Sequence, residues 1–384
     1  MRICVLTHNL KDDNGGGVFS RRLVEGLQKE LGAEVVALTA VGNNLPFEQP
    51  ILYPNKLKLI TALPRIRRII KKCDVVHALD AYPYGIVAAT ATRGLNKKII
   101  LTAVGTGSIH ALYNYSWPMT SLVRWSYGQA SAVTAISRFT RDVILARLPN
   151  LAITVINPGI DPHEATVASR EHVVTDSLGH HHALRDLSPY IVSVGALRWR
   201  KGYHLSIRAF AKVVKEFPKL KYIIVGKQYG RRYYHKMQYH IRRLGLEGKV
   251  FICDSIDRRD DLTAIYEGAE LFCLFPLAEG YDVEGFGIVF LEAAAAGLPI
   301  VTARNGGVED AVREGENAFI ADATGVSAYN DPNLRDPFSD AVQRILRDRG
   351  LKKRMSEASR AFAQESFWDK RMQEYKAMYG GVIQ

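Results

Sequence analysis

Short apolar runs alternate with amphipathic segments along the first half of the chain. The runs predicted as strands are Ile3–Thr7, Glu34–Leu38, Val75–His77, Ile99–Thr102 and Ala132–Ala135, and a helical pattern extends from Val18 to Leu31. Continuous Val, Ile and Leu strands followed by amphipathic helices are typical of a parallel sheet that is covered on both faces. The first half is therefore predicted to be a doubly wound α/β domain.

A second series of the same kind follows. Its predicted strands are Tyr190–Val194, Tyr222–Val225, Val250–Ile252, Leu271–Phe275 and Ile300–Thr302. We expect an α/β protein with two Rossmann-like domains, residues 1–165 and 189–364, and a cleft between them. Ligands of such sheets bind at the carboxyl ends of the strands, so the search for chemistry starts at the loops there.

The stretch from Pro162 to Pro189 separates the two series. It is polar and strand-poor, and we interpret residues 166–188 as a linker with a surface insertion. It contains three adjacent histidines, His180, His181 and His182, which cannot all face one ion from a single strand or helix. A solvated loop without a metal is the expectation.

Composition narrows the class of protein. The chain has 384 residues, which fits about two domains. No apolar run approaches the roughly 18 residues that a membrane-spanning helix needs, and the start lacks the apolar stretch of a signal peptide. The four cysteines, Cys4, Cys73, Cys253 and Cys273, form no Cys-x-x-Cys pair, so we expect reduced thiols and a cytoplasmic protein.

The net charge of +12 favours anionic partners. Two basic stretches, Arg65–Lys72 and Arg231–Arg243, mix cationic and apolar residues at helical spacing, which fits either a solvated helix face or a helix on a membrane surface. We expect peripheral contact with an anionic membrane through the first stretch. No motif that reads DNA or RNA accompanies the charge, so nucleic acid is not expected as a partner.

Glycines follow the first predicted strand, in the segment Asn14-Gly15-Gly16-Gly17-Val18. Without side chains, backbone N–H groups at Gly16 and Gly17 can approach an anion closely, so this segment is a candidate phosphate or sugar site. The pattern matches neither common nucleotide-binding glycine motif, and tight packing of the loop explains it equally well.

Three cations open the second domain, in the segment Val194-Gly195-Ala196-Leu197-Arg198-Trp199-Arg200-Lys201-Gly202. Lys201 at the start of a helix is placed to meet a diphosphate together with the helix dipole. Arg198 and Arg200 either assist or face solvent.

Two carboxylates eight positions apart mark the segment Glu284–Pro299. Glu284 stands beside glycines at a predicted helix start, where the amides of Gly287, Ile288 and Val289 are placed to face a phosphate. Glu292 lies on an otherwise apolar helix and needs a hydrogen-bonding partner, either a ribose or a structural cation.

These segments resemble the retaining glycosyltransferases of family 4, which have the two-domain GT-B fold. The resemblance covers nearly the whole chain, and the E-x7-E element at Glu284 and Glu292 is its most specific part. Further matching stretches are Gly15–Gly17, Thr134–Thr140, Asn157–Asp161, Lys201-Gly202, Asn305–Gly307 and Phe367-Trp368.

The resemblance implies a function and site roles. The protein is expected to move a hexose from a nucleotide diphosphate sugar, of the GDP-mannose or UDP-glucose type, to a glycan, a lipid-linked or a small-molecule acceptor. Lys201 is expected to bind the diphosphate, Glu292 the ribose, and Glu284 the transferred sugar and phosphate, with no cofactor or metal. Gly16 and Gly17 are expected to close over the sugar phosphate, and residues 365–384 to form a terminal helix on the N-terminal, acceptor-binding domain.

Two positions depart from the family pattern. Ala196 stands where the family commonly has Arg, which leaves Arg198 or Arg200 to supply that cation. Val104 stands where the family often has His, and His110 is our candidate substitute in catalysis. These departures support an alternative, a catalytically silent protein that binds nucleotide sugars.

Overall fold

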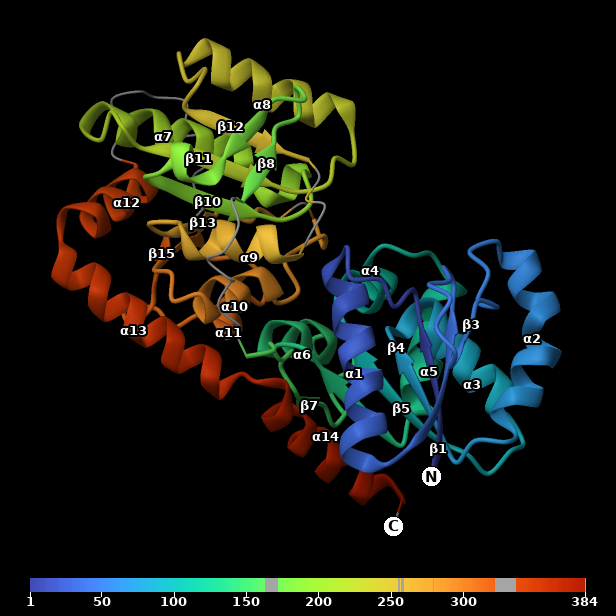
Figure 1. Ribbon diagram of the computed structural model, residues 1–384. Helices are drawn as coiled ribbons and strands as arrows, with labels where there is room; N and C mark the ends of the chain where they lie inside the picture. Colours follow the sequence, from blue (N-terminus) through green and yellow to red (C-terminus); the bar gives the residue numbers. More distant parts are fainter. Residues whose placement is uncertain (163–171, 255, 257–258, 279, 322–335, 384) are drawn as a thin grey trace. The chain divides into compact units, whose positions relative to one another are not determined.

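The chain divides into two compact units. The computed structural model describes all residues except 163–171, 255, 257–258, 279, 322–335 and 384 (Figure 1). The first unit comprises Met1–Gly159, Gly280–Phe286 and Ser366–Gln384, and the second comprises Ile160–Glu279 and Gly287–Glu365. The chain therefore enters the first unit three times.

A seven-stranded parallel sheet forms the first unit's described core, in the order β3-β2-β1-β4-β5-β6-β7. Its strands are β1 (Arg2–Thr7), β2 (Glu34–Thr39), β3 (Glu48–Gln49), β4 (Val75–Leu79), β5 (Lys98–Ala103), β6 (Ala132–Ala135) and β7 (Thr154–Val155). The order reverses between β1 and β4, so the loops after these strands diverge and leave room for a ligand.

The helices of this unit pack in two groups. Their bounds are α1 (Gly15–Leu31), α2 (Lys56–Ile70), α3 (Ile86–Thr92), α4 (Thr106–Tyr113), α5 (Met119–Gly128), α6 (Arg138–Leu145) and α14 (Trp368–Ile383). In Figure 1, α1 and α14 lie side by side, and α3 contacts both α2 and α5. Helix α1 buries Phe19, Leu23 and Leu27, which share one face because four residues make about one turn.

The C-terminal helix is joined to the sheet through a buried histidine. His77 on β4 lies between two hydroxyls: its Nδ1 is 2.7 Å from Tyr379 Oη on α14, and its Nε2 is 2.7 Å from Thr102 Oγ1 on β5. A neutral imidazole satisfies both contacts because one nitrogen donates and the other accepts. Burial lowers the pKa of His77 to about 3.

The second unit has a six-stranded parallel sheet in the order β12-β11-β10-β13-β14-β15. The strands are β10 (Tyr190–Val194), β11 (Lys221–Val225), β12 (Val250–Cys253), β13 (Phe272–Leu274), β14 (Ile300–Ala303) and β15 (Ala318–Ala321). The helices are α7 (Tyr203–Glu216), α8 (Arg231–Arg243), α9 (Arg259–Glu267), α10 (Ile288–Ala295), α11 (Val308–Ala311), α12 (Pro337–Arg347) and α13 (Arg349–Glu365). The prediction of two parallel α/β sheets is confirmed.

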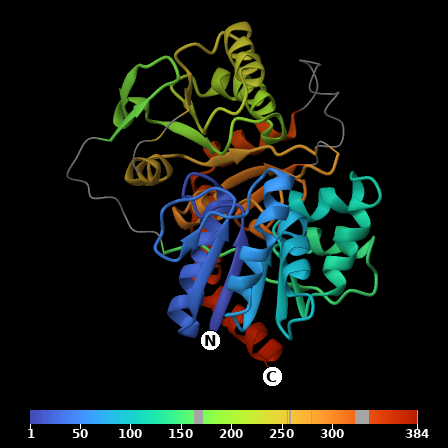
Figure 2. The same cartoon turned by 90° about the vertical axis from the view of Figure 1, so that its right-hand side faces the viewer.

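Three local expectations were wrong. Helix α1 begins at Gly15 rather than Val18, because the Asn14 side chain caps it by accepting from the Gly17 N–H at 2.8 Å. The expected strand-poor linker contains an antiparallel hairpin of β8 (Val173–Thr175) and β9 (His181–Ala183), seen in green at the margin of the second unit in Figure 2. Residues 280–286, expected in the second domain, belong to the first unit.

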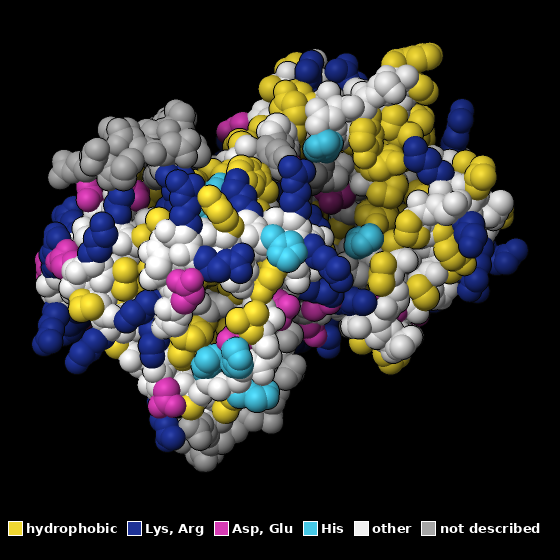
Figure 3. All heavy atoms as spheres, turned by 90° about the horizontal axis from the view of Figure 1, so that it is seen from above, with side chains coloured by type: hydrophobic (Ala, Val, Ile, Leu, Met, Phe, Trp, Pro, Cys, Tyr) yellow, Lys and Arg dark blue, Asp and Glu magenta, His cyan; other side chains and the backbone are white. Residues whose placement is uncertain are grey.

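The surface is rich in cations. Figure 3 shows Lys and Arg side chains, in dark blue, spread over the face that it presents, in keeping with the net charge of +12. None of the helices in the described part of the chain is both long and apolar enough to cross a membrane.

The buried His77 makes the first unit sensitive to acid. The pKa is near 6.5 in the unfolded chain and about 3 in the folded one, so the stability that it contributes is present above pH 6.5 and is lost as the pH falls toward 3. Between pH 7 and pH 5 we expect a loss of about 2 kcal/mol from this group alone.

Urea unfolding at both pH values measures this loss. In His77→Gln the difference in unfolding free energy between pH 7 and pH 5 should shrink by about 2 kcal/mol. An undiminished pH dependence in the variant would show that His77 does not titrate on unfolding.

Candidate functional site

In the second unit, Lys201 lies in the turn between β10 and α7. The turn contains a short 3₁₀ helix, Trp199–Lys201, and ends at Gly202, whose φ of 68° lies in the left-handed region. The Lys201 side chain is buried, and a Cβ atom built on Gly195 would lie 3.6 Å from its Nζ. The side chain of Lys201, the residue predicted to bind the diphosphate, therefore packs against the end of β10 and does not extend into solvent.

Glycines let the backbone segments at this edge of the sheet approach closely. A Cβ on Gly226, after β11, would lie 1.8 Å from the carbonyl oxygen of Gly195, and one on Gly202 would lie 1.9 Å from that of Phe275. The Tyr203 hydroxyl donates to the Gly195 carbonyl at 2.6 Å, and the Leu277 N–H donates to the Arg200 carbonyl at 2.7 Å. The turn that carries Lys201 is thus fastened to both neighbouring strand ends.

Glu292 has the hydrogen-bonding partner that its apolar helix required. The Tyr266 hydroxyl on α9 donates to Glu292 Oε2 at 2.9 Å. Burial, followed by the nearby charge of Glu292, raises the pKa of Tyr266 well above its ordinary value, so the phenol keeps its proton. A carboxylate has two acceptor oxygens, which is the arrangement that suits a diol.

The start of α10 supplies the predicted amides. Gly287 precedes the helix with φ 92° and accepts a hydrogen bond from Phe290 N–H at 2.9 Å. Ile288 and Val289 are its first two residues, whose N–H groups have no acceptor within the helix because of helical geometry. Since β10 and β13 are parallel neighbours, the Lys201 turn and the chain leading to α10 leave the same edge of the sheet.

Arg198 and Trp199 sit among aromatic rings. The Arg198 guanidinium lies 4.2 Å from the Tyr229 ring centre, and Lys236 Nζ lies 3.8 Å from that of Trp199. Trp199 also stacks on His204 at 4.1 Å. Arg198 is therefore paired with Tyr229, which lies in the loop between β11 and α8. These cation–π contacts help to fix the outer side of the Lys201 turn.

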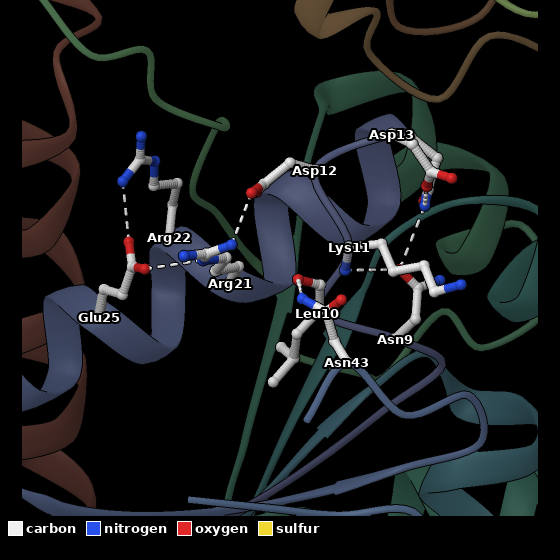
Figure 4. A network of polar contacts seen from close by, with 10 residues as sticks. Asn9, Leu10, Lys11, Asp12, Asp13, Arg21, Arg22, Glu25 and Asn43 are labelled. Carbon is white, nitrogen blue, oxygen red and sulfur yellow. Dashed lines mark hydrogen bonds and ion pairs between the residues drawn. The ribbon is translucent and has the colours of Figure 1, made fainter. Parts of the chain in front are cut away.

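In the first unit, the glycine-rich segment is a packed helix start. A Cβ on Gly17 would lie 2.2 Å from the Lys11 carbonyl oxygen and 2.3 Å from Asn9 Oδ1, so only glycine fits. Figure 4 shows Asn9 accepting from the Lys11 N–H within a network of polar contacts. The Gly17 N–H is already bonded to Asn14, so of the two expected amides only that of Gly16 retains the predicted role.

Asp80, which the sequence analysis missed, organises the loop after β5. Its Oδ1 accepts from Val104 N–H at 3.1 Å and from Ser108 Oγ at 2.7 Å. Asp80 has a φ of 82°, unusual for a residue with a side chain. Burial raises its pKa, against hydrogen bonds from Ser108 and the turn backbone that lower it. The sequence feature that could have identified Asp80 is its position directly after the buried strand β4.

Glu284 lies beside that same loop. A Cβ on the next residue, Gly285, would lie 3.2 Å from the Val104 carbonyl oxygen, and the ring of Tyr281 stacks on Tyr113 at 4.1 Å. Glu284 itself is buried. The structure therefore brings Glu284 together with the loop where the family often has its histidine.

His110 lies one turn into α4. Its ring is 2.8 Å from Asn114 Nδ2, one helical turn onward, and it is half-buried. Of the predicted residues in the first unit, the segment of Glu284 packs against the Val104 loop, His110 lies on the helix that follows that loop, and Gly16 lies at the start of α1. Lys201, Arg198, Glu292 and the start of α10 belong to the second unit. The sequence also led us to expect contacts to the donor base near Val225–Tyr229 and Ser255-Ile256, and of these residues Ser255 lies outside the described part of the chain.

Two parallel α/β units are the architecture of the GT-B glycosyltransferases, and comparison with known sequences shows that the chain belongs to this class. Sequence models described as Glycosyltransferase Family 4 and Glycosyl transferases group 1 match residues 13–164 and 180–362. Between them these matches span most of the chain, and the chain belongs to glycosyltransferase family 4.

The chain is similar to individual proteins in sequence or in fold. A GDP-mannose-dependent alpha-(1-6)-phosphatidylinositol monomannoside mannosyltransferase of Mycolicibacterium smegmatis is 28% identical over 283 residues, 70% of this chain and 69% of that protein. The N-acetyl-alpha-D-glucosaminyl L-malate synthase of Bacillus anthracis is 23% identical over 96% of this chain and 94% of its own. The crystal structure of Anabaena HepE in complex with UDP has a TM-score of 0.76 at 19% identity and full coverage of both chains, which shows the fold.

The contact between Gly226 and Gly195 predicts a sharp difference between two alanine substitutions. Gly226→Ala forces the two backbones apart and should lower the free energy of unfolding of the second unit by about 1–3 kcal/mol. Gly230→Ala is the matched control, because Gly230 has extended backbone with φ −168° and no atom within 4 Å of its Cβ position. Urea unfolding distinguishes them, and equal stabilities would contradict the close approach.

Proposed function

We propose that the protein is a retaining glycosyltransferase that moves a hexose from a nucleotide diphosphate sugar to a glycan, glycolipid or small-molecule acceptor. The single observation that carries the proposal is an arrangement in the second unit of this family 4 protein. Buried Lys201 and the start of α10 follow neighbouring parallel strands, and the Tyr266 hydroxyl orients Glu292. A cation, helix amides and an oriented carboxylate suit a diphosphate and a ribose.

Two types of donor have support. The name of the Mycolicibacterium smegmatis relative specifies GDP-mannose, and HepE was crystallised with UDP and with UDP-glucose. A donor of the GDP-mannose or UDP-glucose type is therefore our proposal. The names of the relatives, which include a phosphatidylinositol mannoside, also support a glycan or lipid-linked acceptor.

The proposed reaction exchanges one C–O bond for another. The bond between the sugar anomeric carbon and the diphosphate breaks, and a bond to the acceptor oxygen forms on the same face of the sugar. The acceptor's proton passes to the departing phosphate oxygen. Lys201 and the α10 amides stabilise the negative charge that develops on the diphosphate, Glu284 and His110 act at the transferred sugar, and no cofactor or metal is needed.

A catalytically silent protein that binds nucleotide sugars is the second candidate. Val104 favours it, because this position often holds a histidine in the family. The retained Lys201, Glu284 and Glu292 favour the enzyme. Transfer from a radiolabelled donor, measured once the donor base is known, separates the two candidates.

Calorimetric titration with UDP, GDP and ADP tests the donor site. One nucleotide should bind tightly, and Lys201→Ala should weaken it by about 10- to 100-fold because a charge-assisted hydrogen bond is lost. Glu292→Ala should weaken it similarly through the ribose. Lys215→Ala, an exposed lysine on α7, is the charge-matched control and should bind like the unmodified protein.

The opposite results are equally informative. If none of the nucleotides binds, or if Lys201→Ala and Glu292→Ala bind as tightly as Lys215→Ala, the diphosphate site is not where we propose. The resemblance would then extend to the fold alone.

Helix α2 has the surface expected of a membrane-docking element. Leu57 and Ile60 are 75% and 59% exposed, and Pro64, Arg68 and Lys71 continue the same helical face. Apolar residues in its first half and cations in its second half fit the acyl boundary and the headgroups of an anionic membrane. We therefore propose peripheral binding through α2.

Flotation with vesicles tests this docking. At low salt the intact protein should float with phosphatidylcholine vesicles that contain phosphatidylglycerol and stay behind with pure phosphatidylcholine. Arg65→Ala/Arg68→Ala should lose about fivefold in affinity for each charge removed, and Leu57→Asp/Ile60→Asp should abolish flotation. Arg242→Ala/Arg243→Ala on α8 is the charge-matched control. Failure of the intact protein to float would refute the proposal.

A further inference from the structure

The hairpin of β8 and β9 brings two of its three consecutive histidines to one side. Thr175 pairs with His181 and Val174 with His182, and the turn between the strands closes through Asp176 N–H, which donates to the His180 carbonyl at 2.9 Å. Alternation along the strand sends His180 and His182 to one face and His181 to the other. His181 accordingly contacts Thr175 Oγ1, at 2.9 Å.

Asp176 lies between the two histidines that share a face. Its Oδ1 accepts from the N–H groups of Leu178 at 2.9 Å and His180 at 3.0 Å, which fixes the carboxylate. Its Oδ2 is 2.9 Å from His182 Nε2 and 3.3 Å from His180 Nδ1. Burial raises the pKa of Asp176, but hydrogen bonds, first from His182, outweigh it and lower the pKa to about 2, so the carboxylate is charged.

One ligand atom from each of the three side chains lies within 4.8 Å of the others. Ligands at the usual zinc distances in a tetrahedron stand about 3.3 Å apart, so the two Asp176 separations are already close to that value. Two imidazole nitrogens and one carboxylate oxygen form a donor set that suits zinc and neighbouring divalent transition metals, whereas Mg²⁺ and Ca²⁺ prefer oxygen alone.

Contacts with β12 and α8 hold the hairpin that carries the three side chains, and the cluster stays open to solvent. The Ser177 N–H donates to the Ile252 carbonyl on β12 at 2.7 Å, and its hydroxyl contacts that of Tyr234 on α8. The His182 ring meets the edge of Phe251 at 4.9 Å. The side chain of His180 is 68% exposed, that of His182 24% and that of Asp176 10%, so an ion can enter from solvent and keep water as a fourth ligand.

We propose that Asp176, His180 and His182 form a binding site for a divalent transition-metal ion of the zinc class. The ion would fasten the tip of the hairpin and stabilise its position beside β12. The site uses none of the residues assigned to the sugar donor, so it is a structural site and independent of the transfer reaction. The proposal replaces the expectation of a solvated loop without a metal. That expectation rested on the three adjacent histidines alone and did not include Asp176.

Titration of the purified full-length chain with Zn²⁺, in competition with a chromogenic chelator, tests the proposal. We expect one Zn²⁺ per chain and a higher midpoint of thermal unfolding with Zn²⁺ than without. His180→Ala and His182→Ala should each weaken Zn²⁺ binding by more than about tenfold, since even indirect changes at metal sites have effects of that size. His181→Ala, on the other face, should bind Zn²⁺ normally, and Mg²⁺ should not bind.

Two controls separate ligand loss from misfolding. Asp176→Asn keeps the Oδ1 acceptor for the turn amides but removes the charge, so it should fold normally and bind Zn²⁺ more weakly. Circular dichroism checks that each variant retains its fold. The proposal fails if the chain binds no Zn²⁺ in this competition, or if His181→Ala weakens binding as much as His182→Ala, which would indicate nonspecific binding to exposed histidines.

Discussion

Parallel strand pairing sends the carboxyl ends of all strands in a sheet to one edge, and both units depend on this constraint. In the second unit, the loop after β10 carries Lys201 and the chain after β13 leads to α10, and these strands are neighbours. In the first unit, the loops after β4 and β5 meet through Asp80. The segments at this edge lie so close together that Gly202 and Gly226 leave no space for a Cβ atom. The backbone itself, rather than side chains alone, therefore fixes the position of the Lys201 turn.

The first unit is assembled from segments that are far apart in the sequence. Tyr379 reaches His77 across 302 positions, Met372 would collide with any side chain at Gly26, and Trp368 lies against Gly159 in the same way. Residues 280–286 add a further segment, which carries Glu284 to the Val104 loop. Glu284 lies within the part of the sequence that matches Glycosyl transferases group 1, residues 180–362, and yet it packs in the first unit. The E-x7-E element accordingly spans a boundary between units: Glu284 lies on one side and Glu292 on the other.

The proposed metal site on the hairpin and the proposed membrane-docking face of α2 both depend on the spacing of side chains along a surface segment. Each follows a simple periodicity, two residues for the hairpin and about three and a half for the helix. In the hairpin, this period places His180 and His182 on the side of Asp176 and His181 on the other side. The N–H groups of the turn hold the Asp176 carboxylate in place. In α2, the period gathers Leu57, Ile60 and Arg68 on one exposed face. In both segments the side chains that share a face, rather than those adjacent in the chain, determine what can bind.

The residue pattern predicted the five longer strands of the first sheet, five of the six strands of the second, the helix after the first strand and the need of Glu292 for a partner, because a strand or helix buried on its faces must show that burial in its own residues. It also indicated Lys201, which adjoins a predicted helix start. The folded structure was needed to show that the partner is Tyr266 and that Asp80 holds the Val104 loop. It also revealed two local contacts that the residue pattern did not predict, the use of the Gly17 amide by Asn14 and the hairpin that brings Asp176 to His180 and His182. The first two contacts join residues 26 and 24 positions apart, which local periodicity cannot relate, since their spacing in the chain is set by the path of the fold and not by the geometry of any one element.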